Sequence, residues 1–320
     1  MHDYFIGIDG GASKTLGVLI DEHGQVLARA RVGGAAIVGA PSTASCAVLA
    51  ALKQRLCAEG AVAATAVTGI GLGLNGIDFA DEYAVQHAEL SACMAIPGAH
   101  LTLVNDGVGA LWGAASAAHL AIVQYGSGFT TAYRSDYGDE QLFDHLDAGG
   151  MFDLRRALAV LVARMIDGRA AATALKAAAL RHYDVQEESE YAELLFRGAI
   201  TPERLATGQM LLFASWQAGD AAATRIVRLA AEDYACAACA MLARVGDALG
   251  QVAFGGGVIE HAPEAFFALL AQGVHAVYPG AIVIRPQLSP AHGAALMSAF
   301  HHGCSPVSLF ERMLREEGDF

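Results

Sequence analysis

Basic residues are scarce in this chain of 320 residues. Lys and Arg total 20 against 33 Asp and Glu, which gives a formal net charge of −13. A surface this acidic repels phosphate backbones, so binding to nucleic acid or to an anionic membrane surface is disfavoured. A nucleotide site is not excluded, because a few glycine N–H groups can hold phosphates locally.

Paired cysteine motifs are also nearly absent. The six cysteines are scattered along the chain, unlike the dense pattern of a small disulfide scaffold. Cys236 and Cys239 form a CxxC, but no second CxxC and no nearby His pair accompanies them. The alanine-rich stretch around them predicts a helix in which both thiols pack as small apolar side chains.

Long apolar runs and targeting signals are missing as well. No basic segment precedes Tyr4, and the uncharged stretch Gly107–Tyr133 is interrupted by polar residues and glycines. A membrane span needs about 20 predominantly apolar residues. We therefore expect a cytoplasmic protein with no membrane partner.

The charged fraction is only 17%, against 54% hydrophobic residues, which excludes a disordered chain. Strands and helices alternate after an initial run of strands, which predicts an α/β fold. The first expected strands are Tyr4–Asp9, Thr15–Asp21 and Val26–Val32, which read as a β-meander. Further expected elements are a helix from Ser42 or Thr43 to Cys57, a helix Phe79–Met94, strands at Val67–Leu72 and Leu101–Asn105, and a helix Asp106–Ala118 capped by Asp106.

A strand, a turn of small residues and a second strand occur twice. The first copy turns at Gly10-Gly11-Ala12-Ser13, and the second at Gly126-Ser127-Gly128. We interpret this as an internal duplication of a phosphate-binding hairpin, one copy in each of two domains, 1–117 and 118–320. The second domain would carry a helical insertion at about 151–246, and a closing helix at about 291–303 is a candidate to return to the first.

The strongest local signal is the segment from Gly7 to Thr15. Its glycines allow backbone N–H groups to approach phosphate oxygens, and hydroxyls of Ser13 and Thr15 add donors. Asp9 stands at a strand end, where a carboxylate can hold Mg²⁺ through water. The segment is not a Walker A loop, because no glycine directly precedes Lys14.

Two further segments are candidates for the same site. Asp106 follows Asn105 at a strand end, where it can be a helix cap or can accept the proton of an attacking hydroxyl. The run Gly255-Gly256-Gly257 follows a buried strand and would let a nucleotide lie against the backbone.

A rival signal is Gly71-Leu72-Gly73-Leu74-Asn75-Gly76, which matches the dinucleotide-binding pattern G-x-G-x-x-G. The sheet does not begin there, and no acid follows at a strand end about 20 residues on. An NAD(P)-dependent oxidoreductase therefore stays a remote alternative.

Together these motifs resemble the sugar-kinase, Hsp70 and actin superfamily, and more closely the BadF/BadG-type ATPases with their N-acetylglucosamine and glucosamine kinases. The resemblance implies two ribonuclease-H-like (actin-like ATPase) α/β domains with ATP and Mg²⁺ in the cleft between them. It implies phosphorylation of an amino-sugar hydroxyl with Asp106 as general base and Asp9 on Mg²⁺. By that likeness the phosphate-binding residues are Gly10, Gly11, Ala12, Ser13, Lys14, Thr15, Gly126, Ser127 and Gly128, and the adenosine-binding residues are Gly255, Gly256 and Gly257. The expected substrate contacts are Asn75, Asn105, Asp106, Ser127, Asp147 and Gly149.

The chain departs from the family pattern on the acceptor side. Ala36 stands where the family has a sugar-contacting Asn, Phe129 replaces a Ser, and only Asp147-Ala148-Gly149-Gly150 remains of a Gly-rich sugar loop. A nucleotide-binding sensor or slowly hydrolysing regulatory ATPase is therefore the main alternative. No cysteine lies near Gly126–Gly150, which disfavours an iron–sulfur dehydratase activator. A homodimer through the helices between Thr201 and Gly246 stays open, against the simpler interpretation that those faces pack in the core.

Overall fold

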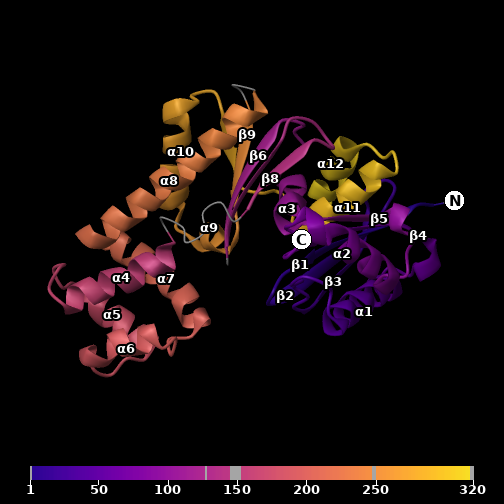
Figure 1. The fold of residues 1–320 in the computed structure, drawn as a ribbon. Coiled ribbons are helices and arrows are strands. Elements are labelled where there is room, and N and C mark those ends of the chain that lie inside the picture. The colour runs from indigo at the N-terminus through magenta and orange to yellow at the C-terminus, as the bar shows by residue number, and fades with distance from the viewer. Residues whose placement is uncertain (1, 127, 145–152, 247–249, 318–320) are drawn as a thin grey trace.

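The computed structural model describes residues 2–126, 128–144, 153–246 and 250–317. Its backbone forms two five-stranded sheets with the strand orders β3-β2-β1-β4-β5 and β10-β9-β6-β7-β8 (Figure 1). The strands of the first sheet are β1 (Tyr4–Gly10), β2 (Lys14–Asp21), β3 (Val26–Gly33), β4 (Val67–Leu74) and β5 (Leu101–Asn105). Those of the second are β6 (Leu120–Tyr125), β7 (Phe129–Arg134), β8 (Glu140–Phe143), β9 (Gln251–Gly255) and β10 (Ile282–Ile284). The predicted α/β class with two related sheets is confirmed.

Both sheets have the same internal plan. In the first, β1 to β3 form an antiparallel meander and β4 joins β1 in parallel. In the second, β6 to β8 form the meander and β9 joins β6 in parallel. The repeated hairpin seen in the sequence is thus repeated in the topology, with its turn between β1 and β2 and again between β6 and β7.

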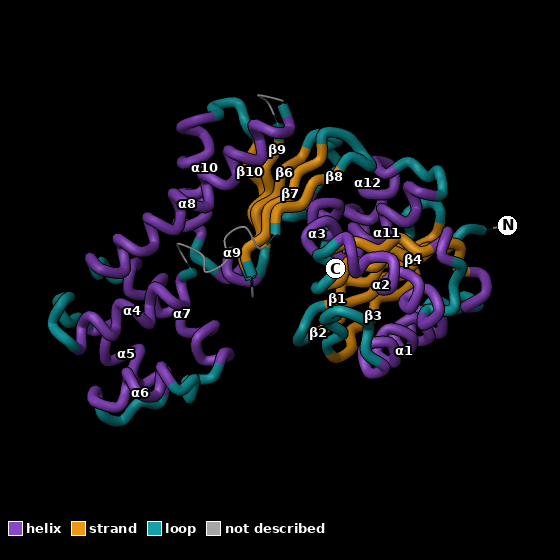
Figure 2. The backbone as a smooth tube through the Cα atoms, viewed as in Figure 1, coloured by secondary structure: helices purple, strands orange, loops and turns teal. Residues whose placement is uncertain are grey.

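Helices cover the sheets and form one extension (Figure 2). Beside the first sheet lie α1 (Thr43–Glu59), α2 (Ala80–Cys93) and two short 3-10 turns, Ala64–Ala66 and Gly98–His100. The extension after β8 contains α4 (Leu154–Ile166), α5 (Ala174–Tyr183), a 3-10 turn Glu188–Glu190, α6 (Tyr191–Phe196), α7 (Pro202–Gln217) and α8 (Ala221–Val245). Both α9 (Gly257–His261) and α10 (Glu264–Val277) come after β9, and α10 packs against α8. One large apolar cluster joins this extension to the second sheet, and a separate cluster fills the first sheet under α1.

The CxxC prediction is wrong for one of its cysteines. Cys236 is exposed on α8, and Cys239 is partly exposed. The alanines around them include Ala235 and Ala238, which are the members of this segment that face the core. The helix is therefore correct, but its buried stripe passes beside Cys236.

Two helices lie between the sheets. They are α3 (Asp106–Ala114) and α11 (Pro290–His301), with α12 (Pro306–Glu317) following. Glycines allow α11 to touch the first sheet, because a Cβ on Gly7 would lie 2.0 Å from the Ala291 carbonyl oxygen. A Cβ on Gly293 would likewise lie 2.0 Å from the Gly109 carbonyl oxygen of α3. The closing helix thus packs on both α3 and the first sheet.

The prediction for α3 needs two corrections. The helix ends at Ala114 rather than Ala118, because Ala115 is fully extended, with φ −162° and ψ 162°. Its N-cap is Asn105 rather than Asp106, since the Asn105 side chain accepts a hydrogen bond from the Gly107 N–H. Asp106 is therefore the first helical residue, and its carboxyl is not required as the cap.

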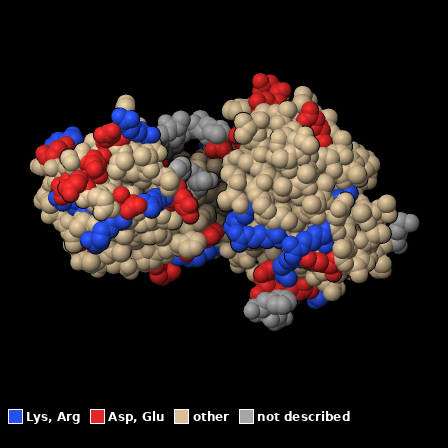
Figure 3. Space-filling view, turned by 90° about the horizontal axis from the view of Figure 1, so that it is seen from below, with Lys and Arg blue, Asp and Glu red and all other residues tan. Residues whose placement is uncertain are grey.

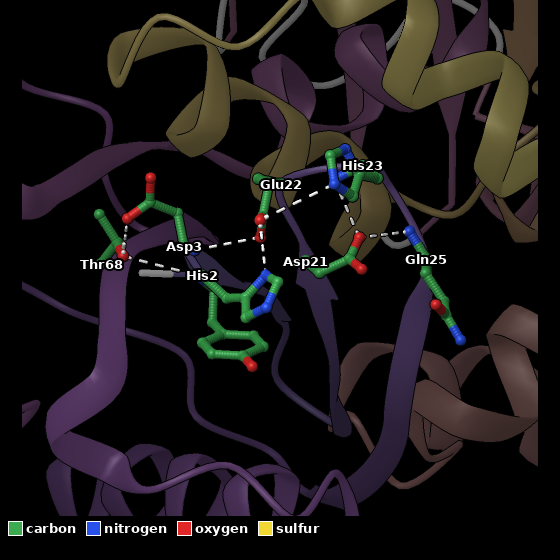
Figure 4. A network of polar contacts seen from close by, with 8 residues as sticks. His2, Asp3, Asp21, Glu22, His23, Gln25 and Thr68 are labelled. Atoms are coloured by element: carbon green, nitrogen blue, oxygen red, sulfur yellow. Dashed lines mark hydrogen bonds and ion pairs between the residues drawn. The ribbon is translucent and has the colours of Figure 1, made fainter.

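A polar network ties the N-terminus to the end of the first sheet opposite the hairpin turn (Figure 4). The Asp3 carboxylate accepts a hydrogen bond from the Thr68 hydroxyl at 2.8 Å, and the Asp3 N–H donates to Glu22. Glu22 also contacts His2, and this hydrogen bond lowers the pKa of the Glu22 carboxyl. The network fixes the start of β1 without taking part in the site at its far end.

Candidate functional site

Polar residues gather where the parallel strands of the first sheet end. The register pairs Asp9 of β1 with Gly73 of β4, and Leu74 of β4 with Asn105 of β5. Because these strands run the same way, Asp9, Asn75 and Asp106 emerge at one edge of the sheet. The structure therefore brings together three residues that the sequence placed in separate motifs.

The β1–β2 turn presents backbone N–H groups at this edge. The Gly11 N–H is used inside the turn, where it donates to the Lys14 carbonyl at 3.0 Å. Ala12 and Ser13 are exposed, and within the described residues their N–H groups donate no hydrogen bond to the protein. Two amides and the exposed Lys14 are thus available to an anion.

The Thr15 hydroxyl lies elsewhere than the phosphate motif suggests. Thr15 is fully buried in β2, and its Oγ1 has no hydrogen-bond partner among the described residues. The loop after β3 closes the other side of the turn, because the Ala35 N–H donates to the Gly11 carbonyl. A Cβ on Gly34 would lie 2.1 Å from the Ala12 carbonyl oxygen, so this packing requires glycine.

Asp9 and Asp106 are partly buried, and each carboxyl lies near other negative charges. Burial, followed by repulsion from Asp106, raises the pKa of Asp9 to about 6. Burial, followed by repulsion from Asp144, likewise raises the pKa of Asp106 to about 6. Two carboxyls in this state favour a cation beside them or a proton to accept, and strongly raised carboxyl pKa values are common at catalytic sites.

Two further acids belong to this site, although the sequence analysis did not single them out. Asp78 accepts a hydrogen bond from the Asn105 amide at 2.7 Å, and it contributes to the raised pKa of Asp106. Its position just after β4, at the carboxyl edge, is a signal that could have found it. Asp144 follows β8, a strand that was not predicted, so nothing in the sequence placed it beside α3.

The predicted substrate contacts lie in different settings. Asn105 is 3% exposed, and its amide is held between the Gly107 N–H and Asp78, so it fixes the start of α3 and the place of Asp78. Asn75 is exposed at the end of β4, and its backbone is bonded to Gly10 and Ile37. Ser127, Asp147 and Gly149 lie outside the described residues.

The second hairpin turn lies beside the triple glycine. Parallel pairing of β6 with β9 sets Gln124 opposite Gly255, so Gly126 and Gly257 become neighbours. A Cβ on Gly126 would lie 3.6 Å from the Gly257 nitrogen, whereas Cβ positions on Gly128 and Gly257 meet nothing within 4 Å. Gly256 has φ +90°, and its Cβ would lie 2.5 Å from the Tyr125 carbonyl oxygen. The turn therefore has an open backbone surface at Gly128 and Gly257, and Gly256 is required by local geometry.

Asp106 lies between the end of β1 and the start of β7, the strands that border the two hairpin turns. A Cβ on Gly107 would lie 2.7 Å from Thr130 Cγ2, and Thr130 is two residues beyond Gly128. Thr130 also donates a hydrogen bond to Asp144 at 3.3 Å. Asp106 thus lies next to Asp9 and the first turn on one side, and next to the start of β7 on the other. Figure 3 shows the surface hollowed between the two halves of the molecule.

The donor set at the first turn fits Mg²⁺ bound together with phosphates. Asp9 supplies a carboxylate oxygen, the ligand type that Mg²⁺ prefers, and Mg²⁺ commonly binds through only one or two carboxylates plus substrate phosphates. Among the described residues no group of three or more His, Cys, Asp or Glu could hold a metal ion by itself. The residues therefore suit a metal that arrives with the nucleotide.

The glycines of the rival dinucleotide motif have a packing role. A Cβ on Gly71 would lie 1.9 Å from the Ala294 carbonyl oxygen of α11, and one on Gly76 would lie 1.9 Å from the Ile37 carbonyl oxygen. Gly73 faces the backbone of Gly109. The chain itself fills the space over these glycines, which leaves no room there for a pyrophosphate.

Comparison with known proteins matches the chain to one ATPase family and to solved structures of sugar kinases. The model of the BadF/BadG/BcrA/BcrD ATPase family matches residues 6–298. A candidate N-acetylglucosamine kinase from Chromobacterium violaceum superposes with a TM-score of 0.71 at 24% identity, covering 92% of this chain and 98% of that one. The ROK hexokinase from Thermus thermophilus gives a TM-score of 0.58 at 19% identity, with coverages of 93% and 98%.

A ROK family glucokinase from Streptomyces griseus, solved with glucose and AMPPNP, gives a TM-score of 0.51 at 17% identity, with coverages of 91% and 98%. At sequence identities this low, these structures show that the chain shares their fold. A search of curated proteins finds no match. None of the described helices is long and apolar enough to span a membrane.

Proposed function

The chain belongs to the BadF/BadG/BcrA/BcrD ATPase family, and from this premise we propose that it is a kinase. It transfers the γ-phosphoryl group of ATP to a hydroxyl of an amino sugar, N-acetylglucosamine or glucosamine. The observation that carries the proposal is the position of Asp106, between the β1–β2 turn and the start of β7. The first turn offers free N–H groups, the second offers an open glycine backbone, and the carboxyl is ready to accept a proton.

In this mechanism Asp106 takes the proton of the acceptor hydroxyl as that oxygen attacks the γ-phosphorus. The bond between the γ-phosphorus and the bridging oxygen breaks, and ADP leaves. A pKa of about 6 leaves Asp106 mostly ionised at neutral pH and able to accept the proton. Phosphoryl transfer passes through a loose transition state, so the placing of the acceptor matters more than the strength of the base.

The turn residues hold the triphosphate. The N–H groups of Ala12 and Ser13 and the ammonium of Lys14 face it from the first sheet, while Gly126 and Gly128 approach from the second, with Gly255 to Gly257 beside the adenosine. Asp9 would hold Mg²⁺, which supplies positive charge against the phosphate oxygens when bound. Preorganised amides need little rearrangement as charge develops, which is the main electrostatic advantage of such a site.

The acceptor faces a row of carboxylates. Asp78, Asp106 and Asp144 can accept hydrogen bonds from sugar hydroxyls and can attract an ammonium group. The hydrogen-bonding capacity suits either sugar, whereas the attraction for an ammonium group applies to glucosamine, because the nitrogen of N-acetylglucosamine is a neutral amide.

The assay is ATP-dependent phosphorylation of N-acetylglucosamine, glucosamine, N-acetylmannosamine and glucose with Mg²⁺, followed by ADP release and by ³¹P NMR of the sugar product. We expect a sugar phosphate from one of the amino sugars at a rate well above ATP hydrolysis without sugar. Nucleotide binding with the same slow hydrolysis for every sugar contradicts the kinase.

That second outcome would favour a nucleotide-binding sensor. Phe129 motivates it, because its ring packs 5.3 Å from that of Tyr234, and it offers no hydroxyl where related kinases have one. Ala36 also lacks a polar side chain, and its carbonyl is occupied by Ser45. A sensor would bind ATP and Mg²⁺ with normal affinity and release ADP independently of sugar.

A further inference from the structure

A buried arginine stands at the place where the chain passes between the two sheets. The chain crosses once after α3, at residues 115–119, and again after β10, at residues 285–289. The second crossing is bonded to the end of α3, because the Gln287 N–H donates to the Ala114 carbonyl and the Leu288 N–H to the Gly113 carbonyl. Arg134, the last residue of β7, is 0% exposed beside them.

The guanidinium of Arg134 is bonded to the first crossing. Its Nε donates to the Ala117 carbonyl at 3.0 Å, and its Nη2 donates to the Ala115 carbonyl at 2.8 Å. Tyr137, in the turn after β7, donates its hydroxyl to the carbonyl of Ser116. Three consecutive carbonyls of the crossing are thereby held by side chains of one β-hairpin.

Aromatic rings enclose the guanidinium. Its carbon lies 4.5 Å from the ring centroid of Tyr137 and 5.3 Å from that of Trp112 on α3. The Trp112 ring in turn packs 5.4 Å from Phe300 of α11. The cluster therefore joins the second sheet to both helices that lie between the sheets.

Burying the Arg134 guanidinium costs folding free energy, so stability by itself does not explain an arginine at this position. No salt bridge to Arg134 occurs within the described part of the chain, and its Nη1 has no hydrogen-bond partner there. Burial of the guanidinium lowers its pKa to about 10. The charges of Glu140 and Asp136 favour the cation from outside salt-bridge distance. A buried cation without a salt bridge is expensive to keep, and apolar residues of similar volume often replace buried charged groups without loss of stability.

The other ends of α3 and β7 lie at the candidate site. Helix α3 runs from Asp106 to the crossing, and β7 runs from Phe129, beside the second glycine turn, to Arg134. At one end Gly107 touches Thr130, and at the other Arg134 holds Ala115 and Ala117. A rotation of β7 against α3 at the crossing would therefore displace the glycine turn relative to Asp106.

We propose that Arg134 is a positioning residue that fixes the angle between α3 and β7, and thereby the placing of Asp106 against the second glycine turn. For its effect on turnover the proposal rests on the proposed function. A displacement near 1 Å weakens the hydrogen bonds that hold a nucleotide across the two turns less than it slows in-line transfer, which needs the reacting atoms aligned.

The test compares four variants with the wild type. Arg134→Met removes the donors, Arg134→Lys keeps the charge but has a single donor nitrogen, and Tyr137→Phe removes one hydrogen bond but keeps the ring. Arg169→Met is the control, because its exposed ion pair with Asp167 lies in the helical extension. Each is measured for kcat with the best sugar and for the Kd of AMPPNP with Mg²⁺.

For Arg134→Met we expect kcat to fall about 100-fold, the loss expected for a displacement near 1 Å, with the Kd within about threefold of wild type. Arg134→Lys should recover part of kcat, Tyr137→Phe should lose less, and Arg169→Met should match wild type. Retained kcat in Arg134→Met, or a Kd that weakens as much as kcat falls, overturns the proposal. If Arg134→Met does not fold, Arg134→Lys and Tyr137→Phe give the same decision.

A second measurement does not depend on any sugar being phosphorylated. Spin labels at Gln54→Cys on α1 and Ala268→Cys on α10, both exposed, report the distance between the two halves. The background replaces the exposed or partly exposed thiols of Cys46, Cys93, Cys236, Cys239 and Cys304 with Ser. We expect a broader distance distribution in Arg134→Met and Tyr137→Phe than in wild type. Distance distributions of equal width in wild type and variants overturn the role of Arg134. If the distributions broaden in the variants but the wild type phosphorylates no sugar, only the proposed kinase activity is overturned.

Discussion

Replacing Asp106 with Asn should separate activity from stability. Asn has the same shape, and its Oδ1 can still accept the hydrogen bond that the Gly107 N–H donates to Asp106 at 3.0 Å. It cannot take a proton from a hydroxyl. Positioned general bases contribute about 10²–10⁴ in rate, so kcat should fall by that factor.

The free energy of unfolding of Asp106→Asn should increase, although kcat falls. Burial and the charges of Asp144 and Asp78 raise the Asp106 pKa from 3.8 to about 6, which corresponds to about 3 kcal/mol against the ionised form. A folded-state pKa above the unfolded value means that wild-type stability falls as pH rises from about 4 to about 6. Asp106→Asn removes this loss, so its free energy of unfolding should exceed that of wild type above pH 6, by up to about 3 kcal/mol, and should match it below pH 4.

The assay pairs initial rates at saturating ATP and sugar with urea unfolding at several pH values. The control is Asp81→Asn, an exposed acid on α2, which should change neither kcat nor the pH dependence of stability. Phosphorylation within about tenfold of wild type, roughly 1.4 kcal/mol of barrier, refutes Asp106 as the base. A variant that is inactive and also destabilised at pH 7 refutes the electrostatic argument.

Three other outcomes are expected. Gly257→Ala should fold normally, since its Cβ meets nothing within 4 Å, but it should weaken AMPPNP binding at least about tenfold. Gly256→Ala should instead lower the Tm, because Gly256 has φ +90° and the new Cβ would lie 2.5 Å from the Tyr125 carbonyl oxygen. Calorimetric binding and thermal melts distinguish the two effects. The value of kcat/KM should decline below about pH 6 as Asp106 becomes protonated, and a flat profile between pH 5 and 8 speaks against a base of that pKa. ATP with Mg²⁺ should raise the Tm while NAD(P) does not, because α11 fills the space at Gly71; stabilisation by NAD(P) alone contradicts the kinase.

Much of the fold follows from local patterns. Buried strands ended by glycines, such as Tyr4–Gly10, and capped helices such as Thr43–Glu59, identify most elements, and the repeated hairpin foretells two related sheets. The end of α3 was missed because Ala115, Ala117 and Ala118 are good helix formers. The extended conformation there is held by hydrogen bonds to Arg134, which lies further along the chain.

Local patterns also predicted part of the candidate site. Asp9 and Asp106 stand directly after apolar strands, so the parallel register alone places them together. Asp144 and Arg134 act through tertiary contacts with α3 and the crossing, and no spacing in the sequence encodes those contacts. The sugar contacts stay predictions, because Ser127, Asp147 and Gly149 lie outside the described residues.

The most direct test of the account is a crystal structure with AMPPNP, Mg²⁺ and the best amino sugar. We expect the phosphates between the amides of Ala12 and Ser13 on one side and the second turn at Gly128 on the other, with Asp9 beside the metal. We also expect a sugar hydroxyl within hydrogen-bond distance of Asp106. Phosphates held by only one of the two glycine turns, or a sugar remote from Asp106, would contradict it.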